Sequence, residues 1–265
     1  MISMPRRHLA LACLDFLDTD PEVFVAAAAE AGFDAVTLRG AGSREPVVAD
    51  LGADARRRHR VLAALEATGL GVLDVEVIRL NGRLSGDEIG CVVELAAECG
   101  ARHLLVVNEE LEPAEAVDVL AAIVAEARAA GVRPCLEPMA FTRCRTLAEA
   151  IATAVPAGAG ILIDALHLQR SGGSAAEVAA AVRQHGGDLF PYLQLCDAPR
   201  AAPPDLRAEA LAGRLLPGEG ELDLAGLLAA LPDAAVSVEA PTAATRGLSP
   251  NGRARAAAST VHTRL

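Results

Sequence analysis

The 265-residue sequence contains no lysine, so all 24 side chains counted as Lys or Arg are arginine. This absence excludes barrel chemistry that depends on a lysine Schiff base or a lysine general base. The formal net charge of -11 disfavours a protein that is held to nucleic acid by its phosphate backbone. We therefore expect no nucleic-acid partner.

The six cysteines form no CxxC pair and no small disulfide framework. Four of them lie among Leu, Val and Ala residues, which predicts buried free thiols: Cys91, Cys99, Cys135 and Cys196. Free thiols indicate a reducing compartment, so we expect a cytoplasmic protein.

The sequence also has no apolar run of the roughly 18 residues that a membrane span needs, so no membrane partner is expected. Its first residues are basic and then apolar, as in a signal peptide. Asp15, Asp18 and Asp20 interrupt this pattern, however, and no small-residue cleavage site follows. We interpret the segment as a first strand.

Short runs rich in Val, Ile and Leu recur along the chain, and longer segments with helical periodicity separate them. The eight predicted strands are 8–16, 34–39, 71–79, 103–108, 132–138, 160–166, 190–197 and 234–240. The predicted helices are 21–31, 54–68, 86–99, 113–130, 146–155, 174–185 and 222–231, with a short closing helix after 250. This alternation predicts an α/β fold, a (β/α)₈ TIM barrel that forms a single domain over residues 1–265.

An open doubly wound sheet is the alternative fold, but no GxGxxG motif follows the first strand to support a dinucleotide site. The connection 198–221 is longer than most loops in compact domains. Loops of this length often form lids or binding elements, so we expect a lid or substrate loop here.

Polar side chains recur at the ends of the last four predicted strands. Because side chains alternate along a strand, Glu137, Asp164, Gln194 and Glu239 are all predicted to face the barrel interior. Active sites of barrels lie at the carboxyl ends of the strands, where these four residues would meet.

Three carboxylates that converge in an apolar barrel would repel each other unless a cation neutralised them. We therefore predict one divalent metal ion, bound by Glu137, Asp164, Gln194 and Glu239. Oxygen ligands favour Mn²⁺ or Mg²⁺ over Zn²⁺ or Co²⁺, although the ligand set does not exclude the latter two.

The pattern EP…DALH…QLCD…VEAP resembles the xylose-isomerase-like sugar phosphate isomerase/epimerase superfamily, also described as the AP-endonuclease type 2 barrel. The resemblance spans most of the chain and is strongest over 132–241. It implies Glu, Asp, His and Glu ligands on the fifth to eighth strands. Gln194 stands where many members have His, a variant that resembles dehydroshikimate-dehydratase-like members.

The resemblance also implies roles for individual residues. Glu137 and Glu239 would act as acid–base groups as well as ligands, and His167 would contact substrate beside them. Related barrels are often dimers or tetramers, so the resemblance allows a homo-oligomer. The predicted partner is a small-molecule substrate.

Other polar residues near the strand ends are candidates for binding that substrate. Glu76 is expected to share the inner face of its strand with Asp74 and Ile78, as an acid–base or substrate contact or as part of a structural ion pair. Arginines near the predicted mouth can present guanidinium groups to a carboxylate or phosphate. They are Arg39, Arg79, Arg143, Arg170 and Arg214.

Four functions remain open from the sequence. The first is a metal-dependent isomerase or epimerase that acts on a small hydroxy-ketone or sugar-like substrate through an enediolate. The second is a metal-dependent dehydratase of a cyclic keto-polyol or 3-dehydroshikimate-like acid. An abasic-site endonuclease fits less well, because that branch needs a His-rich zinc cluster and a basic groove. The fourth is a barrel that binds a ligand without catalysis.

Overall fold

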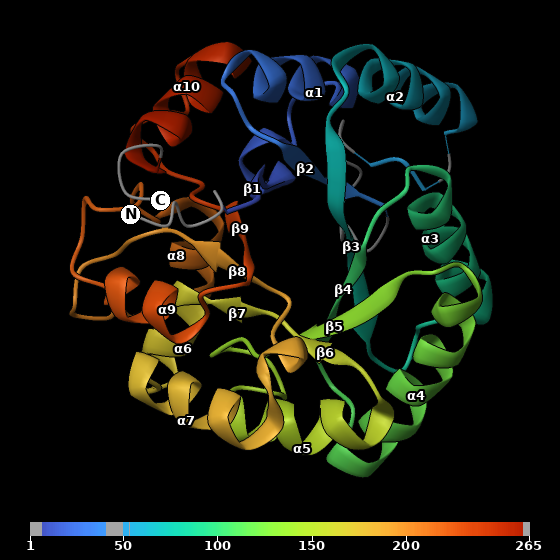
Figure 1. The fold of residues 1–265 in the computed structure, drawn as a ribbon, viewed down its shortest axis with the longest axis vertical. Helices are drawn as coiled ribbons and strands as arrows, with labels where there is room; N and C mark the ends of the chain where they lie inside the picture. Colours follow the sequence, from blue (N-terminus) through green and yellow to red (C-terminus); the bar gives the residue numbers. More distant parts are fainter. Residues whose placement is uncertain (1–6, 41–49, 53, 262–265) are drawn as a thin grey trace, which may run out of the picture.

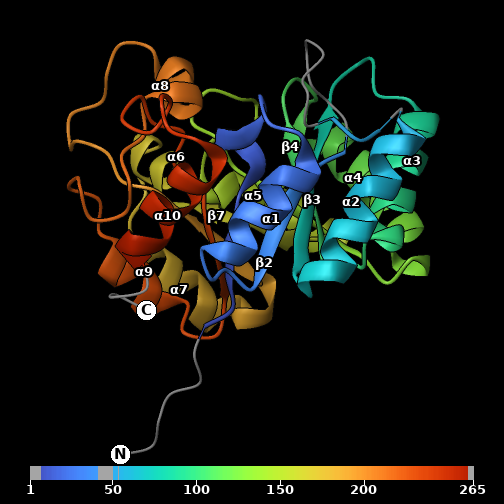
Figure 2. The same ribbon diagram turned by 90° about the horizontal axis from the view of Figure 1, so that it is seen from above.

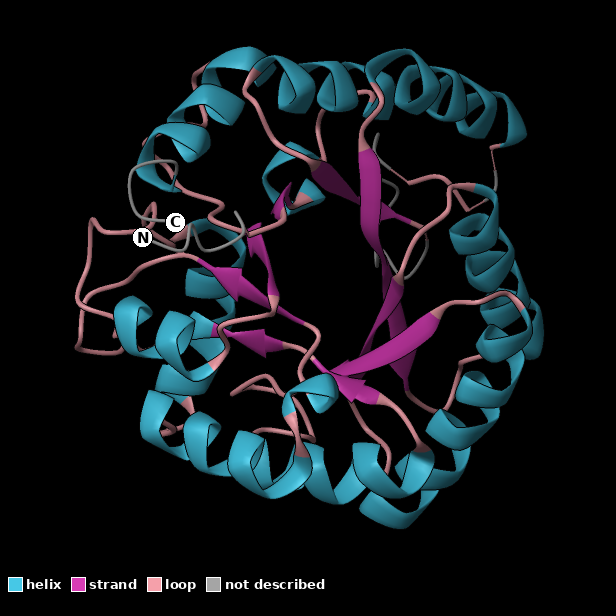
Figure 3. Ribbon diagram, viewed as in Figure 1, coloured by secondary structure: helices cyan, strands magenta, loops and turns pink. Residues whose placement is uncertain are grey.

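The computed structural model describes residues 7–40, 50–52 and 54–261, and in these ranges it shows a barrel of parallel strands surrounded by helices (Figure 1). Nine strands lie in the described ranges, in the order β6-β5-β4-β3-β2-β1-β9-β8-β7. Their bounds are β1 Leu9–Leu11, β2 Ala35–Arg39, β3 Gly71–Leu80, β4 His103–Asn108, β5 Arg133–Glu137, β6 Gly160–Ile161, β7 Ile163–Asp164, β8 Tyr192–Leu195 and β9 Ala235–Val238. The ring of strands confirms the predicted TIM barrel (Figure 3).

The helices lie outside this ring. Their bounds are α1 Pro21–Glu30, α2 Ala55–Thr68, α3 Gly86–Glu98, α4 Pro113–Ala129, α5 Leu147–Ala157, α6 Ala165–Arg170, α7 Ala175–His185, α8 Leu206–Ala212, α9 Leu224–Ala230 and α10 Pro250–Val261. Pro113 occupies the first turn of α4, where its missing N–H is not needed. None of the described helices combines the length and apolar composition that crossing a membrane requires.

Two of the predicted strands differ in the structure. The first ends at Leu11, and the chain then turns into the 3₁₀ helix η1, Cys13–Phe16, where the Cys13 N–H donates to the Thr37 hydroxyl. The predicted strand 160–166 is two short strands, because β6 pairs with β5 whereas β7 pairs with β8. Residues from 165 onward are already helical and form α6.

The apolar residues form two layers. The larger layer lies between the strands and the helices, and a smaller layer fills the barrel interior with residues such as Leu105, Val107 and Leu162. Of the cysteines predicted to be buried, Cys135 and Cys196 are buried, but Cys99 is partly exposed and Cys91 is exposed. The prediction was wrong for Cys91 because local apolar composition does not tell which face of α3 a residue occupies.

Strand β3 breaks the regular alternation of side chains. The pairing with β4 shifts register between Val75 and Ile78, so that one extra residue of β3 is accommodated there. As a result Val77 joins the inner layer and Ile78 the outer one, the opposite of the predicted arrangement. Glu76 nevertheless remains buried and lines the cavity described below.

The long connection 198–221 is tied to the barrel at several points. Leu215 pairs with Asp197, and Gly213 pairs with Thr242, in isolated antiparallel bridges. Arg170 binds Glu209 on α8 through two hydrogen bonds of 2.8 and 2.7 Å. Figure 2 shows α8 above one end of the barrel. The segment thus covers part of the mouth and delivers side chains to it.

Candidate functional site

The four residues predicted at the strand ends lie at the same end of the barrel. Glu137 and Asp164 are the last residues of β5 and β7, Gln194 lies within β8, and Glu239 directly follows β9. All four are at least 95% buried. Glu137 and Glu239 line a cavity of about 340 Å³, whereas Asp164 and Gln194 lie behind its wall.

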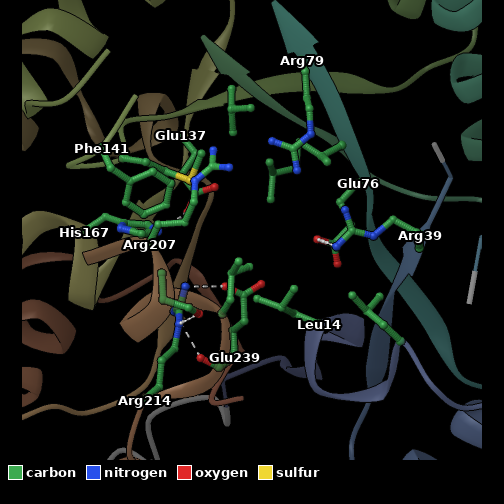
Figure 4. Close-up of a pocket in the computed structure, with 17 residues that line it drawn as sticks. Leu14, Arg39, Glu76, Arg79, Glu137, Phe141, His167, Arg207, Arg214 and Glu239 are labelled. Atoms are coloured by element: carbon green, nitrogen blue, oxygen red, sulfur yellow. Dashed lines mark hydrogen bonds and ion pairs between the residues drawn. The ribbon is translucent and has the colours of Figure 1, made fainter. Parts of the chain in front are cut away.

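Arg214, from the long connection, joins two of these carboxyl groups. Its guanidinium is 2.6 Å from Asp164 Oδ2 and 3.0 Å from Glu239 Oε2, and it also donates to the Glu239 carbonyl oxygen at 3.2 Å. Figure 4 shows Arg214 and Glu239 on the same side of the cavity. The side chain is 2% exposed, so this is a buried charge whose partners are the carboxylates of the site.

Gln194 contributes an amide whose two ends differ. Its Nε2 donates to Glu239 Oε1 at 2.9 Å, which fixes the orientation of the amide. Its oxygen, Oε1, is buried and has no hydrogen-bond partner among the described residues. A buried amide oxygen normally accepts a hydrogen bond or binds a cation, so this atom is suited to a metal ligand.

His167 is on α6 and lies close to the carboxylates of Asp164 and Glu137. Its backbone N–H donates to Asp164 Oδ1 at 2.9 Å, as at the start of many helices, and its Nε2 is 4.0 Å from Glu137 Oε1. The ring of Phe141 meets the imidazole edge-on, with 5.3 Å between the centroids. Burial lowers the pKa of His167 to about 4, so the imidazole is neutral at neutral pH.

The three carboxyl groups titrate differently. Burial raises the pKa of Glu239 to about 8, although Arg214 opposes this shift. Burial and the negative charges of Asp164 and Glu239 also raise the pKa of Glu137. For Asp164, burial is outweighed by the charge of Arg214 and by hydrogen bonds from Arg214 and from the His167 backbone N–H, so its pKa is lowered. The site therefore combines one carboxyl group of lowered pKa with two carboxyl groups of raised pKa.

One group of side chains in the described ranges has the geometry of a metal site: ligand atoms of Glu137, Asp164 and His167 all lie within 4.8 Å of one another. This group contains His167, which the sequence placed as a substrate contact, and shares Glu137 and Asp164 with the predicted ligand set. Together with the unpartnered oxygen of Gln194, these donors fit a divalent cation.

The predicted substrate-binding residues separate into two groups. Arg39, Glu76 and Arg214 line the cavity, as does Arg79. Arg170 and Arg143 do not line it: Arg170 holds Glu209, and Arg143 is 42% exposed and pairs with Glu112 at the surface. Each of these two arginines is therefore paired with a carboxylate outside the cavity, and their contact with substrate stays a prediction.

Several cavity residues were not among the predicted ones. Arg207 on α8 stacks over the Phe141 ring at 5.3 Å and lies 3.8 Å from Glu109. Apolar residues of β3, β4 and the loop after β5 form much of the wall: Val77, Leu105, Val107, Met139 and Phe141. The position of Phe141 just after a barrel strand could have indicated it, but nothing in the local sequence distinguishes Arg207 from a surface arginine.

Comparison with known proteins identifies the fold family. A family model described as a xylose isomerase-like TIM barrel matches residues 25–260. No curated protein sequence matches the chain significantly. The chain also resembles a xylose isomerase-like TIM barrel/4-hydroxyphenylpyruvate dioxygenase fusion protein at 22% identity and a TM-score of 0.77, covering 97% of this chain but only 42% of that one.

Other solved structures resemble the chain over nearly their whole length. The IolI protein with a bound zinc atom shares 16% identity and a TM-score of 0.80, with 97% of both chains covered. The probable 3-DHS dehydratase AsbF from Bacillus anthracis shares 16% identity and a TM-score of 0.71, covering 97% of this chain and 99% of that one. D-Allulose 3-epimerase from Methylomonas sp., in complex with D-allulose, shares 14% identity and a TM-score of 0.71, with 99% of both chains covered. At these identities the likeness shows the fold alone, whereas the family model covers most of the sequence, and the chain therefore belongs to the xylose isomerase-like TIM barrel family.

Proposed function

We propose that this protein is a divalent-metal-dependent isomerase or epimerase that acts on a small hydroxy-ketone or sugar-like substrate. The observation that carries the proposal is a cavity of about 340 Å³ lined by two carboxyl groups of raised pKa, Glu137 and Glu239. Isomerisation and epimerisation both need groups that remove a proton from carbon and return it. The epimerase among the similar structures supports this reaction class.

The metal would be held by Glu137, Asp164, Gln194 and Glu239, with His167 close enough to join or replace one of them. When bound, a divalent ion supplies positive charge that stabilises the negative charge developing on substrate oxygens. The zinc atom in the similar IolI structure supports a divalent metal. The oxygen-rich donor set favours Mn²⁺ or Mg²⁺ for this chain.

The protein's own residues provide the proton transfers. Glu137 and Glu239 come from β5 and from the end of β9, so they approach the cavity from different strands and can serve different faces of a substrate. Neutral His167 can donate or accept a hydrogen bond beside Glu137. Arg214 keeps Asp164 ionised while the other two carboxyl groups change protonation state.

A metal-dependent dehydratase of a cyclic keto-acid is the second candidate, and the lining of the cavity favours it. One wall is apolar, from Val77, Leu105, Val107 and Met139, and suits a flat ring better than a polyol with hydroxyl groups on both faces. Arg79 and Arg207 could bind a carboxylate at the mouth. The dehydratase AsbF has the same fold, and Gln194 is shared with dehydratase-like members in the resemblance described above.

Elemental analysis of the purified protein tests the metal site. Wild type is expected to retain close to one Mn²⁺ per chain after dialysis, and Glu137→Ala and Glu239→Ala are expected to lose most of it. Glu66→Ala removes an exposed carboxylate of α2 and is the matched control, which should retain the metal. Retention of metal by Glu137→Ala and Glu239→Ala would contradict the proposed site, and more than one zinc per chain would support the endonuclease hypothesis.

Product analysis separates the two reactions. The Mn²⁺-loaded protein is incubated with ketohexoses and with 3-dehydroshikimate, and the products are followed by NMR and ultraviolet absorbance. An isomerised or epimerised ketose supports the first proposal. A dehydrated, ultraviolet-absorbing product formed only by the metal-loaded protein would replace it with the second.

A further inference from the structure

A second pair of charged residues lies across the cavity from Glu137 and His167 (Figure 4). Arg39, the last residue of β2, and Glu76, in β3, both line the cavity and are 5% and 4% exposed. The guanidinium Nη2 of Arg39 is 3.4 Å from Glu76 Oε2. These two residues supply polar groups to a part of the cavity that is otherwise mainly apolar.

The carboxylate of Glu76 is held in place by two further side chains. The Cys13 thiol donates to Glu76 Oε1 at 2.8 Å, and the Thr37 hydroxyl donates to the same oxygen at 2.9 Å. Thr37 also accepts a hydrogen bond from the Cys13 backbone N–H, so the two donors support each other. Two donors therefore fix Oε1, which leaves Oε2 beside Arg39 as the oxygen free to meet a ligand.

Arg39 retains a hydrogen-bonding group of its own. Its Nε is buried and has no hydrogen-bond partner among the described residues. The pair thus presents an acceptor, Glu76 Oε2, next to the donor groups of Arg39. A ligand group in the cavity that both donates and accepts can therefore bind Glu76 Oε2 and the guanidinium of Arg39 together.

The charges of the pair decide which ligand fits. Glu76 already offsets the charge of Arg39, and a carboxylate or phosphate placed here would meet the negative Oε2. A hydroxyl group is both donor and acceptor, so it can donate to Oε2 and accept from Arg39. Arg79 and Arg207, which also line the cavity, differ from Arg39 because both approach one carboxylate, that of Glu109, at 3.1 and 3.8 Å.

We infer that Arg39 and Glu76 form a subsite for an uncharged hydroxyl group of the substrate, and that Cys13 and Thr37 are positioning residues for Glu76. This inference rests on the proposed function, because the reacting end of the substrate must then lie at Glu137 and Glu239. It places the substrate across the cavity, with its hydroxyl-bearing end at β2 and β3. It also assigns Arg39 to a neutral group, in place of the carboxylate or phosphate that the sequence indicated.

Calorimetric titration of the Mn²⁺-loaded protein tests the subsite with D-allulose, D-fructose, their 1-deoxy and 6-deoxy analogues, and the carboxylate quinate. Wild type should bind at least one ketohexose, and should bind one of its deoxy analogues about tenfold more weakly, because a site built to bind a hydroxyl discriminates against its loss. Glu76→Gln should weaken binding of the parent sugar about tenfold and leave the affinity for that deoxy analogue nearly unchanged. Quinate should not bind more tightly than the sugar.

Cys13 variants test positioning separately from packing. Cys13→Ala removes the donor to Glu76 and should weaken binding of the parent sugar but not of the deoxy analogue. Cys13→Ser keeps a donor and should restore the difference in affinity between the two sugars. If Cys13 had a purely structural role, Cys13→Ala would weaken binding of both sugars equally. Thr37→Val and Thr37→Ser form the equivalent pair, and circular dichroism and melting temperature check folding.

Three outcomes would overturn the subsite: equal losses for parent and deoxy sugar in Glu76→Gln, tighter binding of quinate than of every ketohexose, or no binding of any sugar. The metal content of the same samples reports on the proposed function independently. Wild type that discriminates the deoxy sugar but holds no metal would refute the metal-dependent reaction and keep the subsite. Wild type that holds metal but binds the parent and deoxy sugars equally would refute the subsite and keep the metal site.

Discussion

Two regions inside the barrel each bury an aspartate to a similar degree, but the pKa values of the two aspartates are shifted in opposite directions. The mouth layer consists of Glu137, Asp164, His167, Arg214 and Glu239. The inner layer, nearer the amino-terminal ends of the strands, consists of Asp74, His103, Cys135 and Tyr192. Asp164 is 1% exposed and Asp74 is 0% exposed.

The partners of the two aspartates explain the difference. Asp164 accepts hydrogen bonds from the Arg214 guanidinium at 2.6 Å and from the His167 backbone N–H at 2.9 Å, and its pKa is lowered. The donor beside Asp74 is the neutral Tyr192 hydroxyl, and burial together with the negative charge of Glu76 outweighs it, so the pKa of Asp74 is raised well above the ordinary value. Burial alone therefore does not decide the charge state; the nearest donors and cations decide it.

Of the substitutions that test this comparison, removal of Arg214 should have the largest effect on stability. Arg214→Met leaves Asp164 and Glu239 buried without their cation, so the metal-free protein should lose about 3–5 kcal/mol of unfolding free energy. Urea unfolding measures this loss, and added Mn²⁺ should recover part of it, because an ion that binds only the folded state stabilises that state. A loss below about 1 kcal/mol would show that the mouth layer does not depend on the arginine.

A smaller loss is expected from the ion pair that ties α8 to α6. Glu209→Ala leaves Arg170 without its two charged hydrogen bonds, which should lower the unfolding free energy by about 2 kcal/mol. If the segment 198–221 positions Arg214, the variant should also lose activity. The unfolding free energy and the turnover rate should then fall together. Unchanged turnover would show that the Arg170–Glu209 pair does not position Arg214.

Asp74 should add to the dependence of stability on pH that Glu137 and Glu239 give the mouth layer. The folded state keeps the Asp74 proton at pH values where the unfolded chain has released it, so stability should fall as pH rises above the ordinary aspartate pKa. The contribution should not exceed about 1.4 kcal/mol per pH unit. Asp74→Asn should reduce this slope in urea unfolding between about pH 5 and about pH 8, since the amide does not ionise, and should leave the part that Glu137 and Glu239 contribute.

Asp118→Asn, which changes an exposed aspartate of α4, is the control and should leave the slope unchanged. A slope that is as steep in Asp74→Asn as in wild type would mean that Asp74 does not hold a proton in the folded state.

Arg143 should give the smallest effect. It is outside the cavity and pairs with Glu112 at the surface, where ion pairs contribute little. Arg143→Ala should therefore match wild type in melting temperature, metal content and turnover. A clear rise in KM would instead support the substrate contact that the sequence suggested.

The regular strands are where sequence reasoning about the site was most successful. Alternation along β5 and β9 predicted that Glu137 and Glu239 face inward, and both line the cavity. The same reasoning misplaced Val77 and Ile78, because a register shift in β3 interrupts the alternation. Hydrophobic pattern records which residues are buried, but an extra residue in one strand is visible only in its pairing with the next.

Contacts between distant segments were not predictable in this way. Arg214 reaches Asp164, 50 residues away, and Cys13 reaches Glu76, 63 residues away. Each pair depends on the closure of the barrel and on the path of a long connection, which set the spacing of side chains that local sequence does not relate. Arg143 and Arg214 look alike in the sequence, yet one lies at the surface and the other is buried.

The sequence by itself determined the alternation of strands and helices, the exclusion of lysine chemistry and the group of polar residues at the strand ends, because periodicity and residue type act locally. The tertiary structure decided how those residues are charged and oriented. Arg214 leaves Asp164 ionised, whereas Asp74 lies beside the neutral Tyr192 hydroxyl and forms no ion pair with any residue that the structure describes. The physical reason is that a buried carboxyl group is governed by the few atoms within hydrogen-bonding distance, and those atoms come from strands and loops far apart in the chain.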